Sequence, residues 1–144
     1  MTDRLRLDGV RVLVVDDAPF VRDVVTDILQ QDGAVVTAVE TAEKALEILQ
    51  RERPTVLLSD LSMPGKGGYW LIGQVRALPP ERGGATPAAA FSAYTSPEHR
   101  AGVLRAGFQF HVDKPVGVLE LVEVVAALAR SQGVQGADAA SSMR

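Results

Sequence analysis

Four short segments of the chain each end a hydrophobic run with a charged or hydrogen-bonding side chain. Asp16 and Asp17 end VRVLVVDD, Asp60 ends TVLLSD, Ser92 ends PAAAFS, and Lys114 follows FQFHVD. In an open parallel sheet, the loops at the carboxyl ends of the strands form the binding crevice. We therefore expect these carboxylate, hydroxyl and ammonium groups to meet in one site assembled from distant parts of the chain.

The acidic members of this set are suited to a divalent cation. Three carboxylates in one crevice repel one another and raise the pKa of at least one of them, and a bound cation removes that cost. Oxygen-only ligands favour a hard ion such as Mg²⁺, with Mn²⁺ as a substitute, and Mg²⁺ keeps several of its waters. We expect Asp17 and Asp60 to be direct ligands and Asp16 to hold a metal-bound water. No pattern of His or Cys residues favours zinc instead.

A carboxylate beside such an ion can attack a phosphoryl group and form an aspartyl phosphate. Catalysis of this step depends on positioning and on neutralising the charged oxygens. The ammonium group of Lys114 is expected to pair with one phosphoryl oxygen, and the hydroxyl of Ser92 to donate a hydrogen bond to another.

The elements that must position these groups alternate between two types. Short apolar runs bounded by turn or polar residues are typical of strands buried on both faces. These runs are Arg11–Val15, Ala34–Ala38, Thr55–Ser59, Ala88–Ser92 and Phe110–Val112. Longer amphipathic stretches between them predict helices over Pro19–Gln31, Ala42–Arg51, Gly68–Leu78, Pro97–Ala106 and Val116–Ala129. Thr41 and Ser96 are the expected N-caps of the second and fourth helices.

This alternation predicts an α/β domain with a parallel five-stranded sheet and helices on both faces. Right-handed crossovers favour a flavodoxin-like (βα)5 three-layer sandwich with strand order 2-1-3-4-5. In that order strands 1 and 3 are neighbours, so Asp16, Asp17 and Asp60 converge. The Arg82–Ala85 segment is interpreted as a mobile connection before the fourth strand.

Composition indicates one soluble domain. The chain has 144 residues, 47% of them hydrophobic, and a net charge of −3, which provides no broad basic surface for nucleic acid. There is no cysteine, no signal-peptide pattern and no apolar run long enough to cross a bilayer, so we expect a cytoplasmic protein without membrane insertion. We divide the chain into an N-terminal extension (1–9), the domain (10–130) and a flexible tail or linker (131–144).

The set DD, then D in DLSMPGKGG, then S in FSAY, then KP resembles the receiver domain of bacterial two-component response regulators. The resemblance implies that Asp60 accepts a phosphoryl group from a histidine kinase or a histidine phosphotransfer protein. It implies that the main-chain carbonyl of Ser62 joins the Mg²⁺ ligands, and that Ser92 and Lys114 sense the phosphoryl group. Further matching residues are Met63, Pro64 and Gly68 in the loop after the acceptor, and Pro115, which in this family commonly follows a cis peptide bond.

One position departs from the commonest form of the family. His111 stands three residues before Lys114, where many receivers have a Tyr or Phe that reports phosphorylation. The stretch AGFQFHVDKPV is similar to receivers attached to hybrid sensor kinases, so the chain is either a single-domain regulator or part of a hybrid kinase. Tyr94 is expected either to be exposed or to shield the phosphoryl group, and His99 to have a structural or surface role.

The resemblance also implies an output surface formed by the fourth helix, the fifth strand and the fifth helix. Phosphorylation would bias the loop Ala93–Ser96 and the helix after it between two arrangements. A downstream protein would bind this surface, and a homodimer is a further option.

Two other functions are compatible with the sequence. Haloacid-dehalogenase-like hydrolases also use an aspartyl phosphate, but their motif has a second Asp two residues later, where this chain has Ser62. A phosphorylation-independent interaction module on the same fold is the other alternative. The complete acidic, hydroxyl and lysine set argues against it, and His111 argues for it.

Overall fold

The computed structural model describes residues 6–93 and 96–138, with side chains as far as residue 131. Its core is a five-stranded parallel sheet with strand order β2-β1-β3-β4-β5. The strands are β1 (Arg11–Val15), β2 (Val35–Val39), β3 (Val56–Asp60), β4 (Ala88–Ser92) and β5 (Phe110–Asp113). The flavodoxin-like order expected from the sequence is confirmed.

Burial distinguishes the central strands from the edge strands. Every residue of β3 and β4 is buried, and so is β1 after its first residue. The edge strands β2 and β5 are less buried. Their first residues, Val35 and Phe110, are exposed, and most other residues of these two strands are only partly buried. The expectation that all strands are buried on both faces was therefore wrong for β2 and β5. Each edge strand has a neighbouring strand on one side only, which leaves its other side open to solvent.

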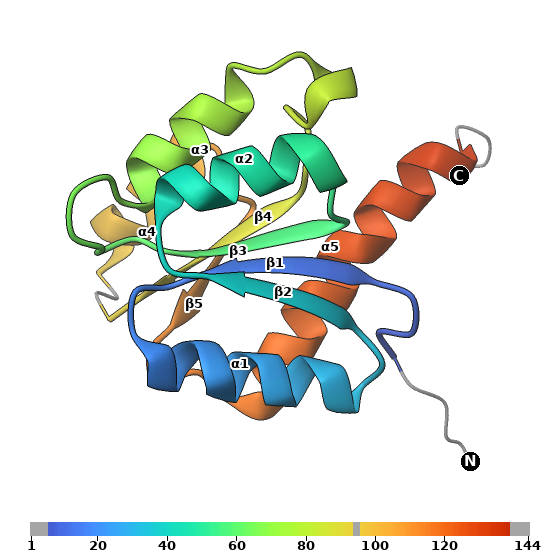
Figure 1. Cartoon of the computed structure of the whole chain (residues 1–144), viewed down its shortest axis with the longest axis horizontal. Helices are drawn as coiled ribbons and strands as arrows, with labels where there is room; N and C mark the ends of the chain where they lie inside the picture. Colours follow the sequence, from blue (N-terminus) through green and yellow to red (C-terminus); the bar gives the residue numbers. More distant parts are fainter. Residues whose placement is uncertain (1–5, 94–95, 139–144) are drawn as a thin grey trace.

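Helices cover both faces of the sheet (Figure 1). They are α1 (Pro19–Gln31), α2 (Ala42–Glu52), α3 (Gly68–Arg76), α4 (Pro97–Ala106) and α5 (Val118–Asp138). One core cluster joins α1 and α5 to the sheet, and a second joins α2, α3 and α4 to the opposite face. Each inner strand contributes alternate side chains to the two clusters, as the two-residue period of a strand requires.

Both expected N-caps are confirmed. The hydroxyl of Thr41 accepts a hydrogen bond from the amide of Lys44 at 3.2 Å, and the hydroxyl of Ser96 accepts one from the amide of His99 at 3.1 Å. Pro97 occupies the first turn of α4, where its missing N–H costs no hydrogen bond. These caps fix where α2 and α4 leave the carboxyl edge of the sheet.

The boundaries of three helices differ from the expected positions, and the smallest change is in α2, which ends at Glu52 and not at Arg51. Helix α3 ends at Arg76 and not at Leu78, because Pro79 follows and disfavours helical geometry in the residue before it. Helix α5 begins at Val118 and continues to Asp138, well beyond Ala129. The sequence after Ala129 is rich in Gly, Ala and Ser and has no apolar periodicity, so it did not predict this extension. The division of the chain at residues 9 and 130 remains a prediction, and residues 139–144 lie outside the described part.

The connection before β4 is not the loose segment that its glycines suggested. A short 3₁₀ helix (Pro80–Arg82) leads into Gly83 and Gly84, which are both buried. A Cβ atom on Gly84 would lie 1.9 Å from the carbonyl oxygen of Leu78, so only glycine fits there. The guanidinium of Arg76 donates hydrogen bonds to the carbonyls of Gly84 at 2.9 Å and Thr86 at 2.7 Å. These hydrogen bonds hold the connection between α3 and β4 against α3.

The segment before β1 also packs against the domain. Leu7 is fully buried in the core cluster that joins α1 and α5 to the sheet, and its amide donates a hydrogen bond to the carbonyl of Asp32.

Among the described residues, no helix combines the length and the apolar character needed to cross a membrane.

Candidate functional site

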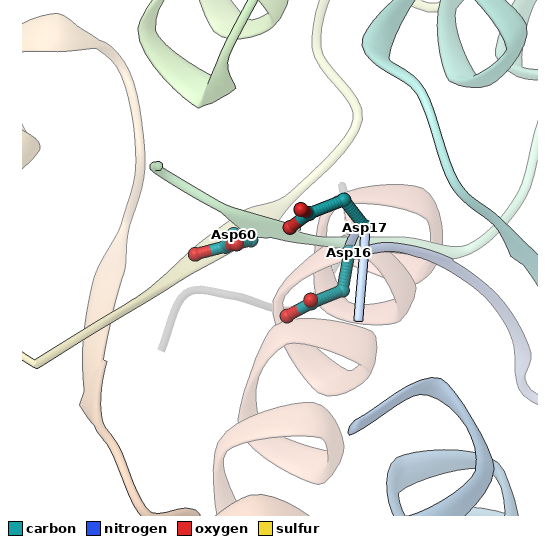
Figure 2. A group of neighbouring side chains, drawn as sticks. All are labelled: Asp16, Asp17 and Asp60. Atoms are coloured by element: carbon teal, nitrogen blue, oxygen red, sulfur yellow. The ribbon is translucent and has the colours of Figure 1, made fainter. Parts of the chain in front are cut away.

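The expected acidic residues come together at the carboxyl edge of the sheet. Asp16 and Asp17 directly follow β1, and Asp60 ends the adjacent strand β3 (Figure 2). One carboxylate oxygen from each of the three lies within 4.8 Å of the others. Asp16 and Asp60 are buried, with 1% and 4% of their surfaces exposed, whereas Asp17 is exposed to solvent. The sequence prediction that strand order would gather these groups agrees with this geometry.

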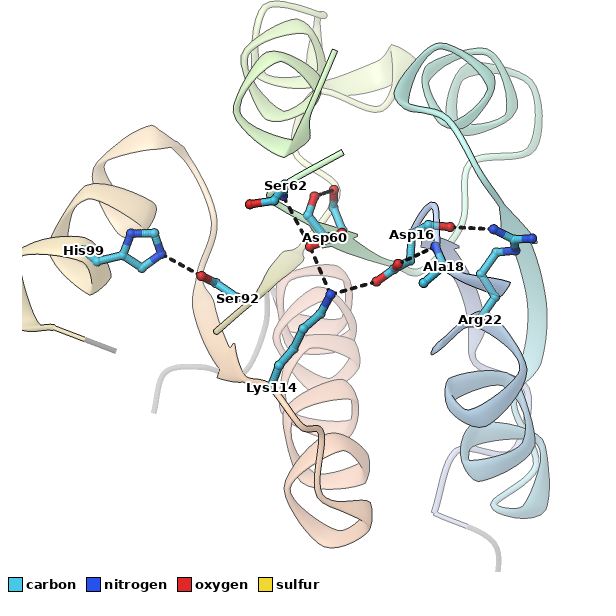
Figure 3. A network of polar contacts seen from close by, with 9 residues as sticks. Asp16, Ala18, Arg22, Asp60, Ser62, Ser92, His99 and Lys114 are labelled. Carbon is cyan, nitrogen blue, oxygen red and sulfur yellow. Dashed lines mark hydrogen bonds and ion pairs between the residues drawn. The ribbon is translucent and has the colours of Figure 1, made fainter. Parts of the chain in front are cut away.

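Lys114 bridges the two buried carboxylates. Its ammonium nitrogen lies 3.2 Å from Oδ2 of Asp16 and 3.2 Å from Oδ1 of Asp60 (Figure 3). Lys114 directly follows β5, two strands away from β3, and its amide donates a hydrogen bond to the carbonyl of Ser92. The long lysine side chain reaches across the end of β4 to the acidic group.

Burial and neighbouring charges shift both titrating groups. Burial raises the pKa of Asp60, the charge of Asp16 raises it further, and Lys114 opposes this only in part. Burial alone would lower the pKa of Lys114, but the carboxylates of Asp16 and Asp60 outweigh it and the pKa is raised. The site therefore holds a positively charged ammonium beside a carboxylate that is costly to ionise.

The residues present fit a hard cation. Only oxygen atoms converge there, and one of the three carboxylates faces solvent, from which an ion can enter. The cost of ionising Asp60 beside Asp16 is the repulsion that a divalent ion would relieve. Lys114 supplies a single positive charge against three acidic groups, so a further cation improves the charge balance.

Backbone contacts fix the loop after β1. The amide of Ala18 donates a hydrogen bond to Oδ1 of Asp16 at 2.9 Å, and the guanidinium of Arg22 donates one to the Asp16 carbonyl at 2.8 Å. The amide of Asp16 bonds to the carbonyl of Val39 on the other neighbouring strand. The sequence did not indicate a role for Arg22, because nothing in its spacing predicts a main-chain partner six residues earlier.

The loop after Asp60 packs closely against that residue. The amide of Ser62 donates a hydrogen bond to Oδ1 of Asp60 at 3.3 Å. Met63 is buried and Pro64 is exposed. Gly68, the first residue of α3, is buried so closely against β3 that a Cβ atom would lie 2.5 Å from the carbonyl oxygen of Asp60. The expected glycine thus has a steric explanation.

Ser92 lies at this edge of the sheet, where its hydroxyl contacts a residue that sequence reasoning did not assign to the site. That hydroxyl lies 3.0 Å from Nε2 of His99, in the first turn of α4. Figure 3 shows this contact on the side of Ser92 opposite Asp60, whose carboxylate has dashed contacts to Lys114 and Ser62. The only sequence signal for His99 was its place three residues after the N-cap.

His111 lies in β5 with only 2% of its side chain exposed. Its ring meets the ring of His99 edge to face, with centroids 5.4 Å apart, and its Nδ1 lies 3.3 Å from Oδ1 of Asp113. Asp113 in turn receives two hydrogen bonds from Arg100 of α4, at 2.9 and 3.0 Å. The expected aromatic position is thus part of a polar group that spans α4 and β5.

The peptide bond between Lys114 and Pro115 is cis, as the family resemblance suggested. Tyr94 and the middle of the loop Ala93–Ser96 lie outside the described residues, so the two alternatives for Tyr94 remain open.

Comparison with known proteins agrees with this geometry. Residues 12–126 match the response regulator receiver domain family. The chain is 46% identical over 114 residues to an uncharacterized 14.6 kDa protein in the sodA1 3′ region of Leptolyngbya boryana, covering 79% of this chain and 86% of that protein. It is 32% identical over 128 residues to the sensory/regulatory protein RpfC of Xanthomonas campestris pv. campestris, covering 89% of this chain but only 18% of RpfC.

A solved structure shows the same fold. The chemotaxis response regulator CheY4 of Vibrio cholerae superimposes with a TM-score of 0.76 at 28% identity, covering 83% of this chain and 98% of CheY4. The chain belongs to the response regulator receiver domain family, and it functions as a phosphoacceptor receiver.

Proposed function

We propose that Asp60 is the phosphoacceptor and that the acidic edge of the sheet is its Mg²⁺ site. The observation that carries this assignment is the placement of Asp60, which is 4% exposed, has Lys114 at 3.2 Å and shares a cluster with Asp16 and Asp17. Among the described residues, no other group of three or more acidic or histidine side chains gathers in this way. Asp60 is the member of that group at the centre of the carboxyl edge.

In the proposed reaction, a carboxylate oxygen of Asp60 attacks the phosphorus of a phosphohistidine. The P–N bond breaks, and its electron pair stays with the imidazole nitrogen of the donor. Lys114 is placed to pair with a phosphoryl oxygen, since its ammonium already lies beside Asp60. The amide of Ser62 and the Lys114 ammonium orient the carboxylate for in-line attack.

For the cation, we assign Asp17 and Asp60 as direct ligands, the Ser62 carbonyl as a third, and Asp16 as the holder of a metal-bound water. When bound, Mg²⁺, or Mn²⁺ in its place, would neutralise charge on the phosphoryl oxygens. Asp16 is well suited to the indirect role, because its Oδ1 is already committed to the amide of Ala18.

The phosphodonor is expected to be a histidine kinase or a histidine phosphotransfer protein. We expect the protein to act in the cytoplasm together with this donor.

Ser92 and Lys114 would sense the phosphoryl group, with His111 connected to Ser92 through His99. A downstream protein would bind the face of α4, β5 and α5, and self-association through that face is a further option. We expect no direct contact with nucleic acid and no membrane insertion, given a net charge of −3 and the helix composition.

The alternatives have less support. The chain spans 18% of RpfC but 86% of the Leptolyngbya protein, so both a single-domain regulator and a receiver within a longer protein fit. For a hydrolase acting on an external phosphomonoester, position 62 would be expected to hold a second Asp, and it is Ser. We therefore propose a signalling switch that assists its own phosphorylation and dephosphorylation.

The test is direct phosphorylation. The protein is incubated with acetyl phosphate and Mg²⁺ and analysed by intact-protein mass spectrometry. The mass of one phosphoryl group should be added to the wild type and to Asp27→Asn, an exposed control on α1. It should be absent from Asp60→Asn and from samples with EDTA. Equal labelling of Asp60→Asn would exclude Asp60 as the acceptor.

A further inference from the structure

The structure assigns His99 as a positioning residue that holds the hydroxyl of Ser92 away from Asp60 in the unphosphorylated protein. This inference rests on the proposed phosphorylation of Asp60 and concerns a residue to which the family resemblance gave no role. The hydroxyl would have to leave His99 in order to reach a phosphoryl group.

The position of His99 is fixed by the start of α4. The Ser96 hydroxyl caps the helix by accepting a hydrogen bond from the amide of His99 itself. Side chains in the first turn of a helix point back towards its N-terminus. The imidazole of His99 is therefore directed at the end of β4, where Nε2 meets Oγ of Ser92 at 3.0 Å.

The position of Ser92 is equally constrained. It ends β4, is 4% exposed, and its carbonyl accepts a hydrogen bond from the amide of Lys114. Its neighbour Phe91 pairs in register with Asp60 of β3. With the backbone held in the sheet, rotation about the Ser92 side chain is the simplest way to bring the hydroxyl over Asp60.

A rotated Ser92 would give up its contact with His99. A serine hydroxyl has one proton to donate, and its oxygen occupies one place at a time. Capture of a phosphoryl group thus competes with the His99 hydrogen bond, whichever of the two groups is the donor. The hydrogen bond between Ser92 and His99 therefore stabilises the unphosphorylated arrangement.

The release of His99 would be felt across α4 and β5. Its ring packs against the buried ring of His111, and His111 lies against Asp113, which is held by Arg100 of α4. The path from Ser92 therefore runs through two histidines and returns to the same helix. It offers this chain a polar substitute for the aromatic side chain at position 111 that is common in the family.

The inference is tested by titrating beryllofluoride, a phosphoryl mimic, in the presence of Mg²⁺. Loss of one hydrogen bond of average net strength changes an equilibrium about five-fold. His99→Phe, which keeps a ring but loses the nitrogen, should bind beryllofluoride about five-fold more tightly than the wild type. His99→Gln, whose amide can restore the contact, should return the affinity towards that of the wild type, and exposed Arg105→Gln should leave it unchanged.

The effect must act through Ser92. In a Ser92→Ala background, His99→Phe should have no further effect on beryllofluoride affinity. The inference would be overturned if His99→Phe bound beryllofluoride no more tightly than the wild type. It would also be overturned if His99→Phe increased the affinity equally in the Ser92→Ala background. Either result would leave the proposed function intact. Failure of the wild type to bind beryllofluoride would overturn the proposed function and the inference with it.

A measurement on the wild type covers the case in which His99→Phe does not fold. Beryllofluoride should shift the ¹⁵N resonance of the His99 Nε2, and Ser92→Ala should shift it before beryllofluoride is added. A His99 ring signal that does not respond to beryllofluoride would contradict the inference.

Discussion

At the scale of single residues, Asp60 is held in an environment that opposes its own charge. It is buried beside Asp16, and the ammonium of Lys114 compensates this only in part, so its pKa is raised. In the proposed function, the same features would prepare the carboxylate for a cation and a phosphodonor, because charged groups are already placed around it. A functional site of this kind costs stability in the resting protein.

This cost gives a prediction for Asp60→Asn with metal chelated by EDTA. Because the folded pKa is raised, folding favours the protonated form; that contribution is present at low pH and is lost as the pH rises through the raised pKa. The variant should therefore be more stable than the wild type at neutral pH, on the order of 1 kcal/mol or about 4 °C in Tm. The difference should vanish in acid.

Thermal unfolding at a series of pH values checks this, with Asp27→Asn as the control on an exposed surface. Equal stability of wild type and Asp60→Asn at every pH would show that the Asp60 carboxylate carries no such cost.

At the scale of secondary-structure elements, the close approach of α3 to β3 shapes the loop that follows Asp60. Gly68 and Gly67 both face main-chain oxygens, those of Asp60 and Leu61, at distances that no side chain could occupy. Gly73, in the same helix, is exposed, and no neighbouring atom lies within 4 Å of the place that a methyl group would take. One helix thus contains a glycine required by packing and a glycine that packing does not require.

Gly68→Ala and Gly73→Ala should therefore have opposite effects. The first forces α3 away from Asp60 and should destabilise the fold by about 1–3 kcal/mol. The second replaces an exposed helical glycine and should stabilise it by up to about 1 kcal/mol. Urea unfolding of the two variants measures both changes. Destabilisation of equal size would mean that helix geometry, and not contact with Asp60, decides the outcome.

The order of the elements was largely predictable, and so was the convergence of the acidic residues. Hydrophobic runs ending in Asp16, Asp60 and Lys114 place those groups at one edge of any parallel sheet with this winding. The contact between Ser92 and His99 was not predictable, because it depends on how the first turn of α4 is directed over β4. The edge strands were misjudged because apolar sequence does not show which neighbours a strand lacks.

At the scale of the whole molecule, Arg76 joins segments that are distant in sequence. Its guanidinium donates hydrogen bonds to main-chain carbonyls before β4 and to the carbonyl of Gly107 after α4, at 3.0 and 2.8 Å. Burial lowers its pKa, which is the direction expected for a guanidinium removed from water. No sequence pattern indicated this role, because the partners are backbone atoms.

Arg76→Met should destabilise the protein by about 2–4 kcal/mol, because several carbonyls lose their donor at once. Arg51→Met on α2 is the matched control and should change stability little, since its ion pairs with Glu47 and Glu52 are exposed. Chemical denaturation measures both. A cost for Arg76→Met no greater than that for Arg51→Met would remove Arg76 from this role.

The hydrogen bonds from Arg76 to the carbonyl of Gly107 also affect how α4 can move. The last residue of α4 is followed at once by this tethered carbonyl, whereas the first turn of the helix meets the sheet through the histidine contact to Ser92. We therefore expect α4 to move by rotating about its C-terminal end, so that the largest displacement is near Pro97.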